Sequence, residues 1–207
     1  MLTARFARNI RVYSTIVRRP PRSAPREAPT PLVFVSAKDW DATSNNGVSF
    51  LSSMLAEKGY TCLQTNLSVP DESLKDSAHV MRNFETSLRQ EIRLSTIPFP
   101  PIIFARSLAC LIAQTYISSH PASGLFMISP PVSNSSVSKL QLPTDLPEFD
   151  FEPEFPVAIM ATAQEMELLR ARHRLGRDPG VDLITVPDVE GPQALAAIEK
   201  WLDELGV

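Results

Sequence analysis

Several features are scarce in this sequence, and each scarcity narrows the classes of protein it can belong to. Of its 207 residues two are cysteine and three are histidine, with no CxxC or Cys/His spacing, so we expect no metal site. The seven glycines form no GxGxxG or P-loop pattern, which predicts no nucleotide cofactor. No apolar run reaches the roughly 18–20 residues that a membrane-spanning helix needs. A net charge of −3 lacks the basic excess of nucleic-acid binders.

The charge is distributed unevenly, because the first 26 residues contain seven arginines and no acid. Leu2, Phe6 and Ile10 recur at every fourth residue, which would place them on one face of a helix. An arginine-rich, acid-free, amphipathic N-terminus resembles a mitochondrial transit peptide, with a matrix-processing cut near Tyr13. A disordered basic arm is the alternative. The pattern therefore predicts a mitochondrial protein, with the matrix as its compartment.

A proline-rich segment separates this N-terminus from the rest of the chain. Residues 19–31 contain five prolines and no hydrophobic periodicity, which is typical of a linker. We therefore predict that residues 1–31 comprise a transit peptide and linker, and that residues 32–207 form one domain. An apolar fraction of 43% is enough for a single domain of this length to bury a sizeable core.

From Leu32 onward, short apolar runs alternate with segments of helical periodicity. Continuous apolar runs are typical of strands buried on both faces, and their alternation with helices indicates parallel βαβ units. The sequence thus predicts an α/β fold, a three-layer sandwich with a mostly parallel six-stranded sheet. The predicted strands cover residues 32–35, 60–65, 102–105, 124–129, 156–161 and 181–186. The predicted helices cover residues 46–58, 72–92, 108–118, 165–175 and 192–205.

The residues that follow each strand matter most for function, because ligands bind beyond the carboxyl ends of parallel strands. The strongest pattern is PPIIFARSLACLIAQTYISSHPASGLFMISPP, residues 100–131, in which Ser107 follows a buried strand and precedes a helix. The positions two before and two after it, Ala105 and Ala109, are small, as a tight turn between strand and helix requires. This arrangement resembles the nucleophile elbow of the α/β-hydrolase superfamily, with alanines in place of two glycines.

The resemblance implies a strand order of 2-1-3-4-5-6 for the six predicted strands, and a core that lacks the first two N-terminal strands of the family. It also implies a role for particular residues. Ser107 takes the position of the nucleophile, and the backbone N–H groups of Ala37 and Leu108 take those of the oxyanion-hole donors. Glu165 is the best stand-in for the triad acid, with Glu167 in reserve.

The general base of a serine hydrolase is missing from the place where the family has it. The loop after the last strand, residues 187–192, contains no histidine. Asp188 or Glu190 could take the place of the base, but a carboxylate is a poor base for a serine hydroxyl. The chain has three histidines, all predicted to lie away from the elbow: His79, His120 and His173.

The segment between the fourth and fifth predicted strands, residues 132–153, is too short for a full helical cap over the elbow. Its aromatic residues Phe149 and Phe151, with Phe155 and with Trp40 after the first strand, could line a groove near the elbow. They could also form a local hydrophobic patch, which we favour.

Two functions therefore stay open, and the sequence does not decide whether the protein is an enzyme. The first is a catalytically degenerate α/β-hydrolase-like protein that acts in mitochondria as a binding or assembly factor, with a small molecule or a mitochondrial protein as its partner. The second is a serine hydrolase, an esterase or thioesterase, that uses Ser107 with an atypical base. A small-molecule receptor without turnover is a third and weaker reading.

Overall fold

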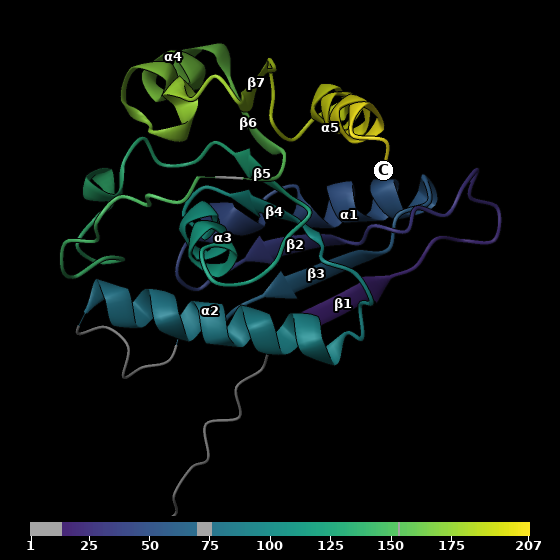
Figure 1. Cartoon of the computed structure of the whole chain (residues 1–207), viewed down its shortest axis with the longest axis horizontal. Coiled ribbons are helices and arrows are strands. Elements are labelled where there is room, and N and C mark those ends of the chain that lie inside the picture. The colour runs from purple at the N-terminus through teal and green to yellow at the C-terminus, as the bar shows by residue number, and fades with distance from the viewer. Residues whose placement is uncertain (1–13, 70–75, 153) are drawn as a thin grey trace, which may run out of the picture.

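The computed structural model describes residues 14–69, 76–152 and 154–207, so the segment 1–13 of the predicted transit peptide lies outside the described residues (Figure 1). The described residues form a seven-stranded sheet in the order β1-β3-β2-β4-β5-β6-β7, flanked by helices. The strands are β1 (Ser14–Arg18), β2 (Leu32–Ser36), β3 (Cys62–Asn66), β4 (Ile102–Arg106), β5 (Gly124–Ile128), β6 (Val157–Ala161) and β7 (Val181–Thr185). The α-helices are α1 (Val48–Glu57), α2 (Ser77–Leu94), α3 (Ala109–Ile117), α4 (Ala163–Arg172) and α5 (Pro192–Glu204).

Six strands, β2 to β7, run parallel, and their order is the predicted one. At the centre of the sheet Val33 of β2 pairs with Leu63 of β3 and with Ile103 of β4. All three side chains are fully buried, because crossover helices cover both faces of a parallel sheet. The prediction of a three-layer α/β fold with a mostly parallel sheet is confirmed.

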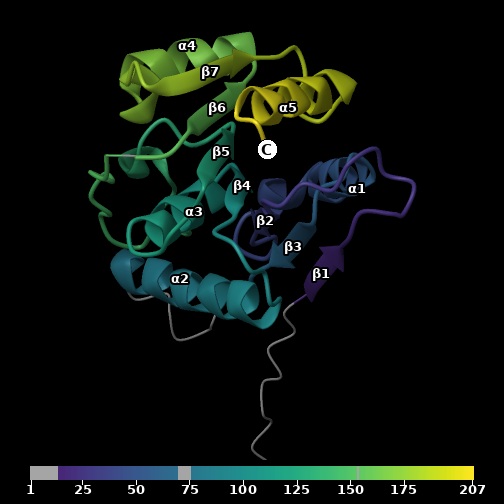
Figure 2. The same ribbon diagram turned by 45° about the vertical axis from the view of Figure 1, so that its right-hand side comes forward.

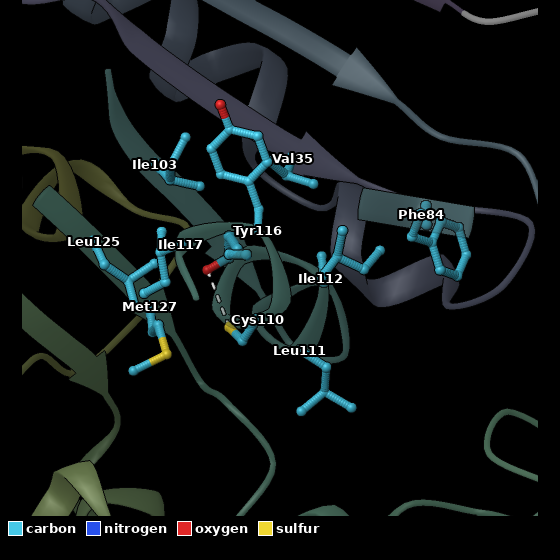
Figure 3. Packing of buried hydrophobic residues seen from close by; sticks show 14 of the residues in the cluster. Val35, Phe84, Ile103, Cys110, Leu111, Ile112, Tyr116, Ile117, Leu125 and Met127 are labelled. Carbon is cyan, nitrogen blue, oxygen red and sulfur yellow. Dashed lines mark hydrogen bonds between the residues drawn. The ribbon is translucent and has the colours of Figure 1, made fainter. Parts of the chain in front are cut away.

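The alternation of side chains along each strand divides the core between the two faces of the sheet. On β4, Ile103 and Ala105 pack with α2, α3 and α4, whereas Ile102 and Phe104 pack with α1 and α5. Figure 2 shows α2 and α3 together on one side of the sheet and α1 and α5 on the other. Figure 3 shows the core on the α2 and α3 side, where Ile117 and Cys110 of α3 lie near Leu125 and Met127 of β5.

The seventh strand, β1, was not predicted. It pairs antiparallel with β3 at the edge of the sheet, where Ile16 lies opposite Gln64. The Thr15 hydroxyl donates to the buried carboxylate of Glu91 on α2 at 2.5 Å, which fixes the strand to a helix of the core. The sheet thus begins one strand earlier than predicted, within the segment that the sequence assigned to the leader and linker.

Both cysteines are free and buried within the core. Burial raises the pKa of the Cys62 thiol to about 12 and also raises the pKa of Cys110, so neither is ionised near neutral pH. Across the described residues, no helix has the length and apolar character to cross a membrane. The same residues contain no group of three or more His, Cys, Asp or Glu side chains arranged to hold a metal ion.

Candidate functional site

The predicted elbow forms at the carboxyl edge of β4. Ser107 follows the strand directly and has a φ of 52°, in the left-handed region, before α3 begins at Ala109. Its backbone N–H donates to the carbonyl of Ile128 on β5 at 2.9 Å. A residue other than glycine costs about 1–3 kcal/mol in such a conformation. Ala105 and Ala109 are buried on either side, so their small size lets strand and helix approach the turn.

The backbone N–H of Leu108, predicted as an oxyanion-hole donor, already has an acceptor. It donates to Oδ2 of Asp41 at 3.0 Å. Asp41 comes from the loop after β2, where its other carboxylate oxygen caps a short 3₁₀ helix (Ala42–Asn45) by accepting the N–H of Thr43. A fixed carboxylate therefore lies where an α/β-hydrolase would stabilise a developing negative charge.

The second predicted oxyanion donor is also occupied. The N–H of Ala37 donates to Oγ of Ser44 at 3.0 Å, in a fully buried position. The next N–H, that of Lys38, donates to Oδ1 of Asn66 at 2.9 Å. Both N–H groups therefore already have acceptors, Ala37 within the loop after β2 and Lys38 at the end of β3.

The proposed triad acid, Glu165, caps its own helix. Its Oε2 accepts the N–H of Thr162 at 3.0 Å and the Thr162 hydroxyl at 2.9 Å, in a capping box at the start of α4. The hydroxyl of Ser129, after β5, donates to the same oxygen at 3.0 Å. Burial acts most strongly and raises the pKa of Glu165, but the hydrogen bonds from Thr162 and Ser129 and the charge of Arg106 outweigh it, so the pKa is lowered. The reserve candidate, Glu167, is exposed.

An ion pair fills the position where the general base is expected. Glu190, in the loop between β7 and α5, accepts from the guanidinium of Arg106 at 2.7 Å. The side chain of Arg106 is only 13% exposed and also donates to the carbonyl of Asn46 at 3.2 Å. Asp188 accepts the N–H of Glu190 at 2.9 Å, which holds the turn of the loop. Both carboxylates that could replace the missing histidine are thus engaged elsewhere.

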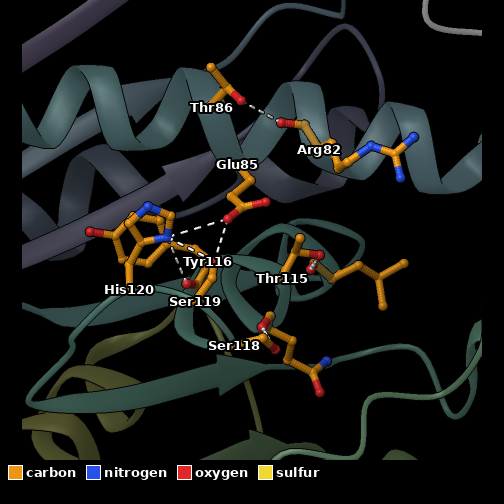
Figure 4. A network of polar contacts seen from close by, with 10 residues as sticks. Arg82, Glu85, Thr86, Thr115, Tyr116, Ser118, Ser119 and His120 are labelled. Carbon is orange, nitrogen blue, oxygen red and sulfur yellow. Dashed lines mark hydrogen bonds and ion pairs between the residues drawn. The ribbon is translucent and has the colours of Figure 1, made fainter.

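The three histidines lie on other parts of the fold. His79 lies exposed at the start of α2. His120 stacks on Tyr116, with ring centroids 4.7 Å apart, and its Nδ1 lies 3.3 Å from the carboxylate of Glu85 (Figure 4). His173 is buried at the end of α4, where burial lowers its pKa to about 4. Within the described residues no histidine hydrogen-bonds the elbow serine.

Solved structures resemble the chain over nearly its whole length. A soluble variant of the monoglyceride lipase of Saccharomyces cerevisiae has a TM-score of 0.60 at 11% identity, covering 93% of this chain and 91% of that one. The esterase Est2 of Thermogutta terrifontis has a TM-score of 0.61 at 12% identity, over 94% and 90% of the two chains. An α/β-hydrolase enzyme from a lagoon-sediment metagenome has a TM-score of 0.60 at 15% identity, over 94% and 96%.

The chain has the α/β-hydrolase fold. No protein-family model and no curated protein matches its sequence. At identities of 11–15% the likeness to these structures establishes the fold alone.

The segment at the position of the α/β-hydrolase lid packs down onto the core. Trp40 is 7% exposed, lies 5.0 Å from Phe84 between ring centroids and donates its Nε1–H to the carbonyl of Gln141 in this segment. Phe149 and Phe151 pack against the same core cluster. The aromatic residues therefore form a packed local patch, which is the interpretation that we favoured.

Sequence reasoning missed two residues that make the main polar contacts around this elbow: Asp41, which accepts the Leu108 N–H, and Arg106, which pairs with Glu190. Both carried a readable signal. Arg106 directly precedes the serine and could pair with an acid in the last loop. Asp41 begins an Asp-Ala-Thr stretch that is typical of a helix cap, and it follows the strand next to β4. What the sequence could not show is that the second oxygen of Asp41 reaches Leu108, 67 residues later.

Proposed function

We propose that the protein is a catalytically degenerate α/β-hydrolase-fold protein that acts by binding rather than by hydrolysis. The hydrogen bond from the Leu108 N–H to the Asp41 carboxylate carries this proposal. In a serine hydrolase this donor must be free to bind the negatively charged oxygen of the tetrahedral intermediate. Here an acceptor with a negative charge of its own occupies it.

The hydrogen bond between the Leu108 N–H and Asp41 should slow hydrolysis for two reasons. Loss of one oxyanion-hole donor costs about 10²–10³ in rate in serine hydrolases. Two like charges about 4 Å apart also repel each other by roughly 4 kcal/mol at an effective dielectric constant of about 20. The carboxylate of Asp41 therefore disfavours the transition state that the elbow would have to stabilise.

No base hydrogen-bonds Ser107 among the residues that the structure describes, and this supports the same proposal. A serine hydroxyl is a weak nucleophile and needs an adjacent group to take its proton. Glu190 pairs with the guanidinium of Arg106 at 2.7 Å, so its carboxylate is already engaged and is not directed at the serine hydroxyl. Glu165 accepts three hydrogen bonds at the start of α4.

A fluorophosphonate activity probe on the purified full chain tests this proposal. We expect no labelling of the protein, whereas an active serine esterase in the same tube is labelled. Labelling of the protein that disappears in Ser107→Ala would contradict the proposal. Ser129→Ala is the matched control, because Ser129 also follows a central strand and has a positive φ of 45°.

The second candidate function is a serine esterase or thioesterase that uses Ser107. The strained φ of 52° favours it, because this is the conformation that exposes the hydroxyl at an elbow. It predicts hydrolysis of p-nitrophenyl esters or of short acyl thioesters by the full chain, lost in Ser107→Ala and retained in Ser129→Ala. Rates equal to those of the Ser107→Ala variant with every substrate would exclude it.

A mitochondrial location is part of the proposal, and it rests on the arginine-rich N-terminus. The predicted cut after Tyr13 precedes β1, which begins at Ser14, so processing there leaves every described strand complete. N-terminal sequencing of the protein recovered from mitochondria should give Ser14 as the first residue. Replacement of Arg5, Arg8 and Arg11 by glutamine should prevent import, and mitochondrial recovery of that variant would contradict this part of the proposal.

A further inference from the structure

A cavity of about 910 Å³ opens at the edge of the sheet opposite the elbow. Its walls come from the connection between β1 and β2 and from residues 95–99, which precede β4. All of these segments lie at the amino ends of the parallel strands, whereas Ser107 follows the carboxyl end of β4. A strand of five residues is about 16 Å long, so the cavity and the elbow are separate sites.

The outer wall of the cavity is fixed by contacts with the body of the protein. The guanidinium of Arg26 pairs with Asp203 of α5 at 2.8 Å and donates to the hydroxyl of Tyr60 at 2.5 Å. The N–H of Ala28 donates to the carbonyl of Gly59 at 2.8 Å. Gly59 has a φ of 111°, and a Cβ there would lie 2.1 Å from the carbonyl oxygen of Arg26. Residues 19–31, which the sequence indicated as a linker, are therefore ordered against the domain and form one wall of the cavity.

Prolines stiffen this wall. Of the five prolines in residues 19–31, four line the cavity. Because each proline fixes its φ, a wall of this composition loses little conformational freedom when a ligand binds. A volume of about 910 Å³ lies within the range of roughly 300–1,000 Å³ that small-molecule sites occupy.

The lining of the cavity combines positive charge with apolar surface. Arg19 and Arg22 line it and are exposed, and neither makes an ion pair within the described part of the chain. Glu27 is the one acid among the lining residues. Val17 and Phe99 also line it, and they remain 44% and 54% exposed. These arginines belong to the arginine-rich N-terminal stretch of a chain whose net charge is −3, so they give this cavity a positive charge that the chain as a whole lacks.

We propose that this cavity binds a single-chain amphipathic anion, a molecule with a carboxylate or phosphate head and an aliphatic tail. Arg19 and Arg22 hold the head, because guanidinium groups pair with both kinds of anion through charge-assisted hydrogen bonds. Val17 and Phe99 cover the tail, which removes their exposed apolar surface from water. The inference goes beyond the proposed function and does not depend on whether Ser107 is active.

Isothermal titration of the full chain with dodecanoate, kept below its critical micelle concentration, tests the inference. We expect binding of one molecule per chain. The double variant Arg19→Gln/Arg22→Gln should weaken binding by at least about tenfold, since hydrogen bonds to charged groups are the strong ones. Phe99→Ser should weaken it as well. The control is Arg170→Gln/Arg172→Gln, which removes the same charge from exposed positions on α4 and should leave the affinity unchanged.

Two further ligands test the roles of the anionic head and the aliphatic tail separately, and a vesicle assay tests for membrane binding. Acetate, a head without a tail, and dodecyl maltoside, a tail without a charge, should both bind much more weakly than dodecanoate. Equal affinity for the maltoside would overturn the role of the arginines. An equal loss of affinity in the α4 control variant would overturn the location. Sedimentation with vesicles of acidic phospholipid, in the absence of any binding of monomeric dodecanoate, would show that the basic surface meets a membrane and would contradict a cavity ligand.

Discussion

The two edges of the sheet differ in how their polar groups find partners. At the carboxyl edge the Leu108 N–H is bound by Asp41, and Arg106 is bound by Glu190. At the amino edge Arg19 and Arg22 line a cavity of about 910 Å³ and make no ion pair with any described residue. At the carboxyl ends of the strands, where α/β-hydrolases have their active site, these polar groups are therefore paired with one another. At the amino ends, the guanidinium groups of Arg19 and Arg22 are available to bind a ligand.

Gly59→Ala should disrupt the amino edge alone. The new methyl group would meet the carbonyl oxygen of Arg26, and the residue would keep a φ that side chains disfavour. We expect a loss of roughly 2–4 kcal/mol in the free energy of unfolding, measured in urea, and weaker dodecanoate binding. Gly206→Ala is the control, because Gly206 has a φ of 72° with no atom nearby and should lose only about 1 kcal/mol from strain. Equal losses in both variants would mean that no wall is packed against Gly59.

Asp41→Ala should destabilise the carboxyl edge by about 1–2 kcal/mol in the same unfolding measurement. The variant loses the cap of the 3₁₀ helix and leaves the Leu108 N–H without an acceptor. Asp39→Ala is the control, because Asp39 is an exposed aspartate of the same loop. Dodecanoate affinity should be unchanged in both variants, and a loss of affinity in Asp41→Ala would mean that the two edges are coupled.

The strain at the elbow can be measured by comparing glycine with alanine at position 107. Ser107→Gly should be more stable than Ser107→Ala by about 1 kcal/mol, because glycine adopts the φ of 52° without strain. Thr115, inside α3, should give the opposite order, with alanine more stable than glycine by about 1 kcal/mol. If alanine were also the more stable residue at position 107, the elbow would not be strained.

Glu165 should make the stability of the folded protein depend slightly on pH in the acid range. Its pKa is lower in the folded protein than the ordinary value of 4.5, so its contribution to stability is present above that value and is lost as the pH falls through the folded pKa. We therefore expect Glu165→Gln to be less stable than the wild type at pH 7 in thermal unfolding, and the difference to shrink as the pH falls below the ordinary value of 4.5. Glu167→Gln, an exposed neighbour on α4, should show no such trend.

Most of the fold could be predicted from the sequence because its signals are local. The parallel strands are continuous apolar runs, and the turn at Ser107 follows from a buried strand that meets a helix across small residues. β1 was missed because five residues between arginines and prolines carry no period of their own. It becomes a strand only by pairing with β3, whose sequence lies more than 40 residues away.

The contacts at the elbow could be predicted only in part, because the sequence shows local features and not the pairing of distant residues. The missing histidine is visible in the sequence of residues 187–192. The contacts that close the elbow join distant residues, and the carboxylate of Asp41 gives no sign in the sequence of which N–H it accepts. The cavity was missed because residues 19–31 lack periodicity, and a segment without periodicity reads as a linker until its contacts with Gly59 and Asp203 are known.

Hydrogen exchange of the full chain with and without dodecanoate compares the two edges most directly, because it follows the amides of both in one experiment. We expect slower exchange in residues 19–31 and 95–99, where the cavity walls lie, and no change in residues 37–44, 105–110 and 187–191 around the elbow. Protection of the elbow peptides with the cavity peptides unchanged would contradict it, since the ligand would then occupy the carboxyl edge that we infer to be closed.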